Sequence, residues 1–320
     1  MKHIAQKLLQ QSLLSESFNI TNIEKVEDEG STRQYFRLSV NLQNHSEKFI
    51  LCQYEKSALL QAQDFIKASQ FLNDHHIPCP KVLAISDDGL FQLQTDAGTA
   101  SLKEYLKNTL HFEIIEDVFR HLLALQKLDI PAFISHKQFH YEKLLFELNF
   151  FFEKLSFIPG FESRHIQLQP FFSSLAQRLN QPELFVVTHR DFHSMNIMIN
   201  HMKQVQFIDI QDLMTGLPYY DLSSFVYDPY MNFSSHEQSR ILDLYEHLSG
   251  VTIDYSLFHA QALQRVIKAL GSYLYLYYKM NKLKYAQFFK PAIDIICRLN
   301  ELCDKNKDLL TVMDILKETI

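Results

Sequence analysis

The stretch HRDFHSMNIMIN, residues 189–200, decides how this 320-residue chain is expected to fold. It sets His189, Asp191 and Asn196 in the pattern H-x-D-x-x-x-x-N, and the segment IDIQD (208–212) follows it. Because 15 residues are histidines, and Asp and Asn are each roughly one residue in twenty, chance would produce this pattern about 0.04 times. β-rich runs also flank the pattern. We therefore interpret it as a functional motif and not as a hairpin whose polar residues merely cap turns.

The residue types of the motif match the needs of phosphoryl transfer. That reaction requires a carboxylate that orients the acceptor hydroxyl, ligands for magnesium on the nucleotide phosphates, and positive charge near them. Asp191 is the predicted catalytic carboxylate, and His189 is expected to support it chiefly by holding the loop through hydrogen bonds. Asn196 and Asp209 offer the hard oxygen donors that magnesium prefers, so they are the predicted metal ligands.

The hydrophobic periodicity changes near residue 97. Residues 1–96 mix an opening helix, a helix over 57–74 that begins with a capping serine, and two hairpins over 35–54 and 81–95. Helical periodicity dominates the rest of the chain, over 101–128, 137–158, 165–180, 234–248, 256–280 and 286–317, with one β-rich island around the motif. We expect an α+β, bilobal, protein-kinase-like fold. Residues 1–96 would form a nucleotide-binding β-sheet N-lobe, and residues 97–320 a mainly helical C-lobe for catalysis and substrate binding.

Composition and charge exclude several other classes. A hydrophobic content of 47% with 21% charged residues is globular. The net charge of −6 argues against nucleic-acid binding. Only 7 glycines occur and none are clustered, which excludes a P-loop enzyme or a Rossmann dehydrogenase. No apolar run approaches ~20 residues, and the N-terminus lacks signal-peptide features, so we expect a cytoplasmic protein without a membrane partner.

The motif resembles that of the aminoglycoside phosphotransferase superfamily, whose enzymes share the kinase-like fold. Eukaryotic protein kinases carry the same Asp and Asn but use D-F-G and a long activation segment. Here only eleven residues separate Asp209 from Asp221, and Gln211 stands where that glycine would be. Asp221 itself is predicted to be a helix N-cap, with bracing of the catalytic loop as the alternative.

Within that superfamily the chain is similar to bacterial N-acetylmuramate/N-acetylglucosamine anomeric kinases of peptidoglycan recycling. Five segments carry the resemblance in order over most of the chain: GSTRQYFRL (30–38), YEKLLFELNFFFEKL (141–155), THRDFHSMNIMI (188–199), IDIQDLMTGLPYYDLSSFVYDPY (208–230) and LQRVIKALGSYLYL (263–276). The resemblance implies ATP and Mg²⁺ as cofactors and an N-acetylated amino sugar as the acceptor.

The resemblance also implies binding residues. The nucleotide would meet Ser31, Thr32 and Arg33 in the first segment, and Gln94 and Asp96 at the connector between the lobes. The candidates for contacts with the sugar hydroxyls are Glu147, Gln211 and Asp212. Glu147 could instead lie on a solvated helix face, and Asp212 could contact magnesium or serve as a turn residue.

Two departures leave alternatives open. Tyr227 stands where the family tends to have Arg, so substrate specificity could differ. The third strand lacks the lysine that usually pairs the nucleotide phosphates, and Arg33 or Lys56 could supply that charge. One alternative is another small-molecule kinase, acting on an aminoglycoside, a choline-like alcohol or another sugar. A cationic substrate of that kind would require several carboxylates around Asp191. The other alternative is a nucleotide-binding pseudokinase.

Overall fold

The computed structural model describes residues 1–13, 17–26, 33–107, 111–159, 161 and 166–319. Its internal contacts divide the chain into two compact units. Unit 1 comprises Met1–Tyr105 and Asn196–Asp212, and unit 2 comprises Leu106–Met195 and Leu213–Ile320. The predicted boundary between residues 96 and 97 separates a nucleotide-binding lobe from a catalytic lobe. This assignment of roles stays a prediction.

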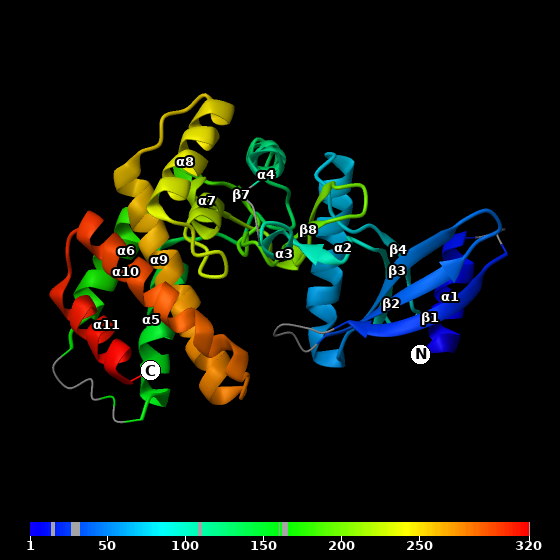
Figure 1. Ribbon diagram of the computed structural model, residues 1–320, viewed down its shortest axis with the longest axis horizontal. Helices are drawn as coiled ribbons and strands as arrows, with labels where there is room; N and C mark the ends of the chain where they lie inside the picture. Colours follow the sequence, from blue (N-terminus) through cyan, green and yellow to red (C-terminus); the bar gives the residue numbers. More distant parts are fainter. Residues whose placement is uncertain (14–16, 27–32, 108–110, 160, 162–165, 320) are drawn as a thin grey trace. The chain divides into compact units, whose positions relative to one another are not determined.

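Unit 1 is built on a five-stranded antiparallel sheet in the order β1-β2-β3-β5-β4 (Figure 1). Its strands are β1 (Asn19–Val26), β2 (Gln34–Asn41), β3 (Ser46–Gln53), β4 (Val82–Ile85) and β5 (Phe91–Thr95). Both predicted hairpins are present, as β2–β3 and β4–β5. Strand β1 was not predicted, because its side chains are mostly exposed and polar and only Ile20 is buried.

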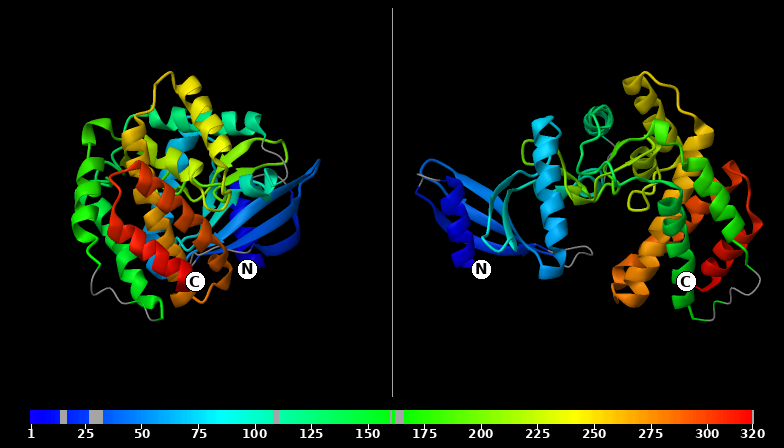
Figure 2. Two further views of the ribbon diagram at one scale, coloured as in Figure 1. Left: turned by 60° about the vertical axis from the view of Figure 1, so that its left-hand side comes forward. Right: turned by 180° about the vertical axis from the view of Figure 1, so that it is seen from behind.

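Unit 1 also contains two longer helices, α1 (Lys2–Leu13) and α2 (Leu59–Asp74). Helix α1 lies along one face in Figures 1 and 2 and buries Ala5, Leu8 and Leu9 in a cluster with sheet residues. Helix α2 follows the 3-10 turn η1 (Lys56–Ala58). The predicted serine cap of α2 is wrong, because this turn takes up Ser57 and makes Ala58 the N-cap.

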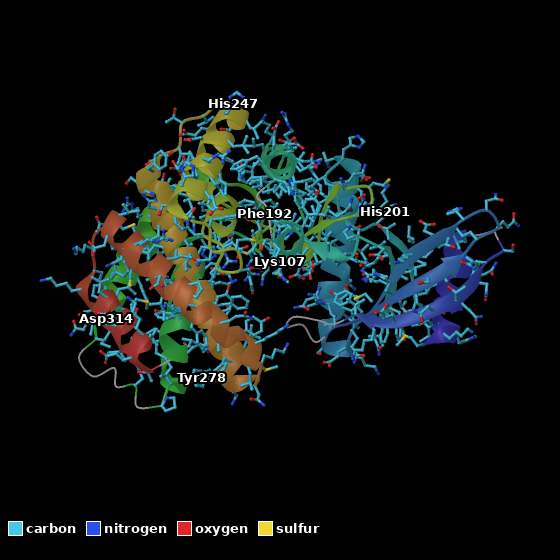
Figure 3. The ribbon with its side chains drawn as sticks, viewed as in Figure 1. Lys107, Phe192, His201, His247, Tyr278 and Asp314 are labelled. Atoms are coloured by element: carbon cyan, nitrogen blue, oxygen red, sulfur yellow. The ribbon has the colours of Figure 1, made fainter. Side chains whose placement is uncertain are left out.

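A second, smaller sheet of unit 1 carries the end of the motif. It pairs β6 (Ala100–Ser101), β8 (Ile197–Ile199) and β9 (Val205–Phe207) in the order β6-β8-β9. The short helix α3 (Leu102–Tyr105) and the 3-10 turn η4 (Ile210–Asp212) complete the unit. His201, labelled in Figure 3, lies in the turn between β8 and β9. Gly98 has φ 112°, and a Cβ there would stand 2.7 Å from the Ile199 carbonyl oxygen, so this close approach requires glycine.

Unit 2 is mainly helical. Its longer helices are α4 (Phe112–Gln126), α5 (Tyr141–Lys154), α6 (Gln169–Leu179), α7 (Tyr219–Val226), α8 (Ser235–Ser249), α9 (Tyr255–Leu274), α10 (Phe289–Leu302) and α11 (Lys307–Thr319). Strands β7 (Val186–Thr188) and β10 (Met214–Gly216) pair antiparallel. Helix α9 packs against α5, α7 and α10 and buries 15 of its 20 residues.

The core of unit 2 requires close approach of its helices. A Cβ on Gly271 of α9 would stand 2.8 Å from the Phe151 Cα of α5, so these two backbones nearly touch. The helix predicted over 286–317 is two helices in the structure, because Asn300 bonds the backbone of Asn306 at the break. In the part of the chain that the structure describes, no helix combines the length and apolarity that membrane crossing requires.

Candidate active site

The loop that carries Asp191 leaves β7 and is held within unit 2 by buried carboxylates. Asp221 on α7 accepts hydrogen bonds from the backbone N–H of His189 at 2.6 Å and of Arg190 at 2.9 Å. Burial raises the pKa of Asp221 to about 6, although the nearby His189 charge and these two hydrogen bonds lower it. The predicted N-cap role of Asp221 is wrong because α7 already begins at Tyr219. The structure shows the alternative, a brace for the loop that carries Asp191.

The loop backbone takes a conformation that needs such support. Arg190 has φ 78°, in the left-handed region, which costs about 1–3 kcal/mol for a non-glycine residue. Further along, Asp228 accepts a hydrogen bond from the Ser194 N–H at 2.9 Å. The ring of buried His189 packs edge-on against Phe192, which is labelled in Figure 3. The predicted role of His189, holding the loop through hydrogen bonds, stays a prediction.

Asp191 faces two cations from α9. Its Oδ1 lies 3.3 Å from Arg265 Nη2 and 3.3 Å from Lys268 Nζ. Burial alone would raise the pKa of Asp191, but the charges of Lys268 and Arg265 outweigh it and hold that pKa well below its usual range. Asp191 is therefore an ionised carboxylate that can accept a hydrogen bond from a hydroxyl group and so orient it.

Arg265 and Lys268 are site residues that the sequence reasoning missed. They lie three positions apart on α9, so they share one face of that helix. A signal was present in the segment LQRVIKALGSYLYL, where two cations interrupt an otherwise apolar helix. A buried cation needs a partner, and the partner here is an aspartate 74 residues away.

Glu147 lies inside unit 2, on α5. Its side chain is only 3% exposed, so the alternative of a solvated helix face is wrong. Oε2 accepts from Gln264 Nε2 at 3.0 Å and from the Tyr220 hydroxyl at 3.4 Å. Oε1 lies 3.5 Å from Arg190 Nη2. Glu147 thus contacts the residue next to Asp191, and contact with a sugar stays a prediction.

The predicted metal ligands come together within unit 1. Asn196 precedes β8 and Asp209 follows β9, and the Ile208 N–H donates to the Asn196 carbonyl oxygen at 3.0 Å. Both residues therefore lie at the same end of the hairpin. Asp209 has φ 63°, a left-handed conformation that aspartate tolerates better than most residues do.

The donor chemistry at this hairpin end fits magnesium. The amide oxygen of Asn196 and the carboxylate of Asp209 are hard donors, and Mg²⁺ usually takes only one or two carboxylates together with phosphates and water. Within the described ranges, no group of three or more His, Cys, Asp or Glu side chains could hold a metal by itself.

Asp209 accepts hydrogen bonds from two side chains of unit 1, those of Arg33 and Gln211. Arg33 Nη2 lies 2.7 Å from Asp209 Oδ1, and Gln211 Nε2 donates to the same oxygen at 2.9 Å. Arg33 Nη1 also donates to Gln211 Oε1 at 2.9 Å, and Gln211 Nε2 donates to Asp212 Oδ2 at 2.9 Å. Arg33, Gln211 and Asp212, predicted for two different ligands, thus form one cluster around a predicted metal ligand.

The other predicted nucleotide residues are differently placed. Ser31 and Thr32 lie outside the described residues. Gln94 is buried in β5, where its Nε2 donates to Gln92 Oε1 at 3.1 Å. Both carboxylate oxygens of Asp96 are bonded by Arg37, at 2.6 and 3.1 Å. Contacts of these residues with a nucleotide stay predictions.

The chain belongs to the phosphotransferase enzyme family, whose profile it matches over residues 22–257. This match confirms both the predicted enzyme class and the resemblance to the aminoglycoside phosphotransferase superfamily. The chain is 26% identical over 275 residues to the N-acetylmuramate/N-acetylglucosamine kinase of Neisseria meningitidis serogroup B. The aligned residues cover 79% of this chain and 78% of that protein.

Solved structures confirm the predicted kinase-like fold. Choline kinase LicA from Streptococcus pneumoniae has a TM-score of 0.63 at 13% identity, covering 93% of this chain and 99% of that one. Aminoglycoside phosphotransferase APH(3'')-Id from Streptomyces rimosus, solved with ADP and streptomycin, has a TM-score of 0.55 at 16% identity, covering 84% of this chain and 99% of that one. At these identities the likeness concerns the fold alone.

Proposed function

We propose that this enzyme is an ATP- and magnesium-dependent sugar kinase that phosphorylates the C1 hydroxyl of N-acetylmuramate or N-acetylglucosamine. It would act in the cytoplasm, in the recycling of cell-wall sugars. The N-acetylmuramate/N-acetylglucosamine kinase relative supports this acceptor, and the ADP complex of a structural neighbour supports the nucleotide.

The observation that carries the choice of acceptor is the charge around Asp191. An amine acceptor calls for carboxylates near the reacting hydroxyl, but Asp191 is flanked by Arg265 and Lys268, with Arg190 and His193 also favouring its ionised form. At an effective dielectric constant of about 20, each like charge 5 Å from an ammonium group opposes it by roughly 3 kcal/mol. The surroundings of Asp191 therefore support a neutral or acidic acceptor over a choline-like alcohol or an aminoglycoside.

The proposed reaction follows from the roles of the residues. Asp191 accepts a hydrogen bond from the sugar C1 hydroxyl and orients its oxygen for in-line attack. The γ-phosphoryl group passes to that oxygen, ADP leaves, and the hydroxyl proton passes through Asp191 to solvent. A hemiacetal hydroxyl is more acidic than an ordinary alcohol, so a carboxylate with a low pKa suffices.

Asn196 and Asp209 would hold the magnesium ion. When bound, such an ion neutralises charge on the phosphate oxygens as it develops. The presence of Asp191, Asn196 and Asp209 together supports an active enzyme over a nucleotide-binding pseudokinase, because each fills a role that transfer requires.

A panel of acceptors tests this proposal. ADP release would be followed with N-acetylglucosamine, N-acetylmuramate, glucose, choline, ethanolamine and streptomycin at matched concentrations. We expect the two N-acetylated sugars to give kcat/KM at least about 100-fold above the amines, the equivalent of the ~3 kcal/mol charge penalty. A preference for any of the three amines would refute the proposed acceptor and leave the phosphotransferase class intact.

A further inference from the structure

Strand β3 has no lysine at the position that usually binds the nucleotide phosphates. The residues of β3 from Phe49 to Gln53 are buried or half-buried. Among them, the fully buried Cys52 packs in a cluster with Tyr54, Ala58 and Ala62. Helix α2 offers no glutamate to hold a lysine in place. Phosphoryl transfer uses positive charge at the phosphates, so the other cations of unit 1 are candidates to supply it.

Arg33 is placed to do so. It stands directly before β2, its side chain is only 9% exposed, and its guanidinium bonds Asp209 at 2.7 Å and Gln211 at 2.9 Å. The ring of Tyr35 lies 5.7 Å from the guanidinium carbon. An arginine side chain stays protonated in proteins, so the charge at this place is permanent.

The geometry also explains why an arginine suits this place. A guanidinium is a planar fork with five N–H donors, and it can bond a carboxylate on one edge and phosphate oxygens on the other. A lysine reaching from β3 would present only a point charge. The rival cation, Lys56, is exposed on the turn η1 and lacks such a fork.

We propose that Arg33 is the phosphate-binding cation of this enzyme and replaces the lysine that is missing between Phe49 and Gln53 of β3. In the nucleotide-free enzyme its fork holds Asp209. With a nucleotide bound, the guanidinium would turn from Asp209 to the phosphate oxygens, and Asp209 would then be able to hold magnesium. This role rests on the proposed use of ATP, and it is independent of which acceptor the enzyme phosphorylates.

Nucleotide binding without metal tests this role directly. Calorimetry would measure the affinity of the full-length enzyme for adenosine, ADP and ATP in EDTA and then in Mg²⁺. Arg33→Met should weaken metal-free ATP and ADP binding at least about tenfold, as expected for a lost charge-assisted contact, and leave adenosine binding within about twofold. Arg33→Lys should recover part of the loss, and Lys56→Met should bind all three like the wild type.

Each other outcome has a clear meaning. Unchanged metal-free ATP affinity in Arg33→Met, with only the magnesium-dependent gain lost, would show that Arg33 merely orients Asp209 and would overturn the proposal. Equal losses for adenosine and ATP would show a structural role and would also overturn it, as would a loss in Lys56→Met instead. Arg33→Lys keeps the charge and so covers the case in which Arg33→Met fails to fold. A wild type that binds no ATP would defeat the proposed function itself.

Discussion

The electrostatic setting of Asp191 can be tested by replacing Lys268 with methionine. Lys268 Nζ lies 3.3 Å from Asp191 Oδ1, and the two side chains are 16% and 24% exposed. At an effective dielectric constant of about 20 their attraction is roughly 5 kcal/mol. Solvent screening and the remaining charge of Arg265 reduce the net effect to about 1–2 kcal/mol.

The sign of the effect follows from the charge. Lys268 favours ionised Asp191, so its loss raises the pKa of that carboxyl. Protonated Asp191 accepts the hydrogen bond of the acceptor hydroxyl only weakly and cannot take up its proton. The acid limb of the kcat/KM profile should therefore move to higher pH in Lys268→Met. On that limb kcat/KM should fall about tenfold, and on the alkaline plateau kcat/KM should change little.

The assay is a pH series of kcat/KM with N-acetylglucosamine, together with thermal unfolding of each variant. Lys268→Arg keeps the charge and should keep the wild-type limb. Lys317→Met removes a surface lysine of α11, which is 41% exposed, and serves as the matched control. An acid limb that stays in place in a fully folded Lys268→Met would refute the account of how Asp191 is kept ionised.

Three further changes address other parts of the site. Asp191→Asn should keep nucleotide binding yet lower kcat by about 10²–10⁴-fold, measured by ADP release, since orientation of the hydroxyl acts in the transition state; near wild-type kcat would remove its role. Asp209→Ala should abolish the gain in ATP affinity that Mg²⁺ provides, and calorimetry that finds the same gain would contradict its role as a metal ligand. Asp221 has a pKa raised to about 6, so the folded state holds its proton in a range where the unfolded chain has lost it. Its contribution to stability is present below about pH 4 and is lost as the pH rises towards 6, so Asp221→Asn should show a smaller fall of Tm over that window than the wild type, and parallel Tm curves would contradict this assignment.

The sequence predicted the parts of the site that are local. Asn196 and Asp209 lie within 14 residues of one another, and a hairpin of that length imposes its own geometry. The hairpin pairing that brings Asn196 and Asp209 to one end could be expected from the two short β-rich runs alone.

The parts that sequence could not predict depend on long-range packing. Nothing local shows that Arg265 and Lys268 turn toward Asp191, or that Glu147 is buried beside Arg190, because the helices that carry them pair only in the folded unit. Arg33 and Lys56 were both candidates for the phosphate charge, and the sequence did not show that Arg33 lies 2.7 Å from Asp209. Strand β1 was not predicted from the sequence, because an exposed edge strand need not alternate polar and apolar residues.

Phosphorus NMR of the reaction product tests the central claim most directly. The enzyme would be incubated with ATP, Mg²⁺ and N-acetylglucosamine or N-acetylmuramate, and in parallel with the methyl glycoside of N-acetylglucosamine, which is blocked at C1. The account predicts a new phosphomonoester signal coupled to the anomeric proton with the free sugars and no product with the methyl glycoside. Phosphorylation of the methyl glycoside, or activity confined to aminoglycosides or amino alcohols, would contradict the assignment of the enzyme as a sugar 1-kinase.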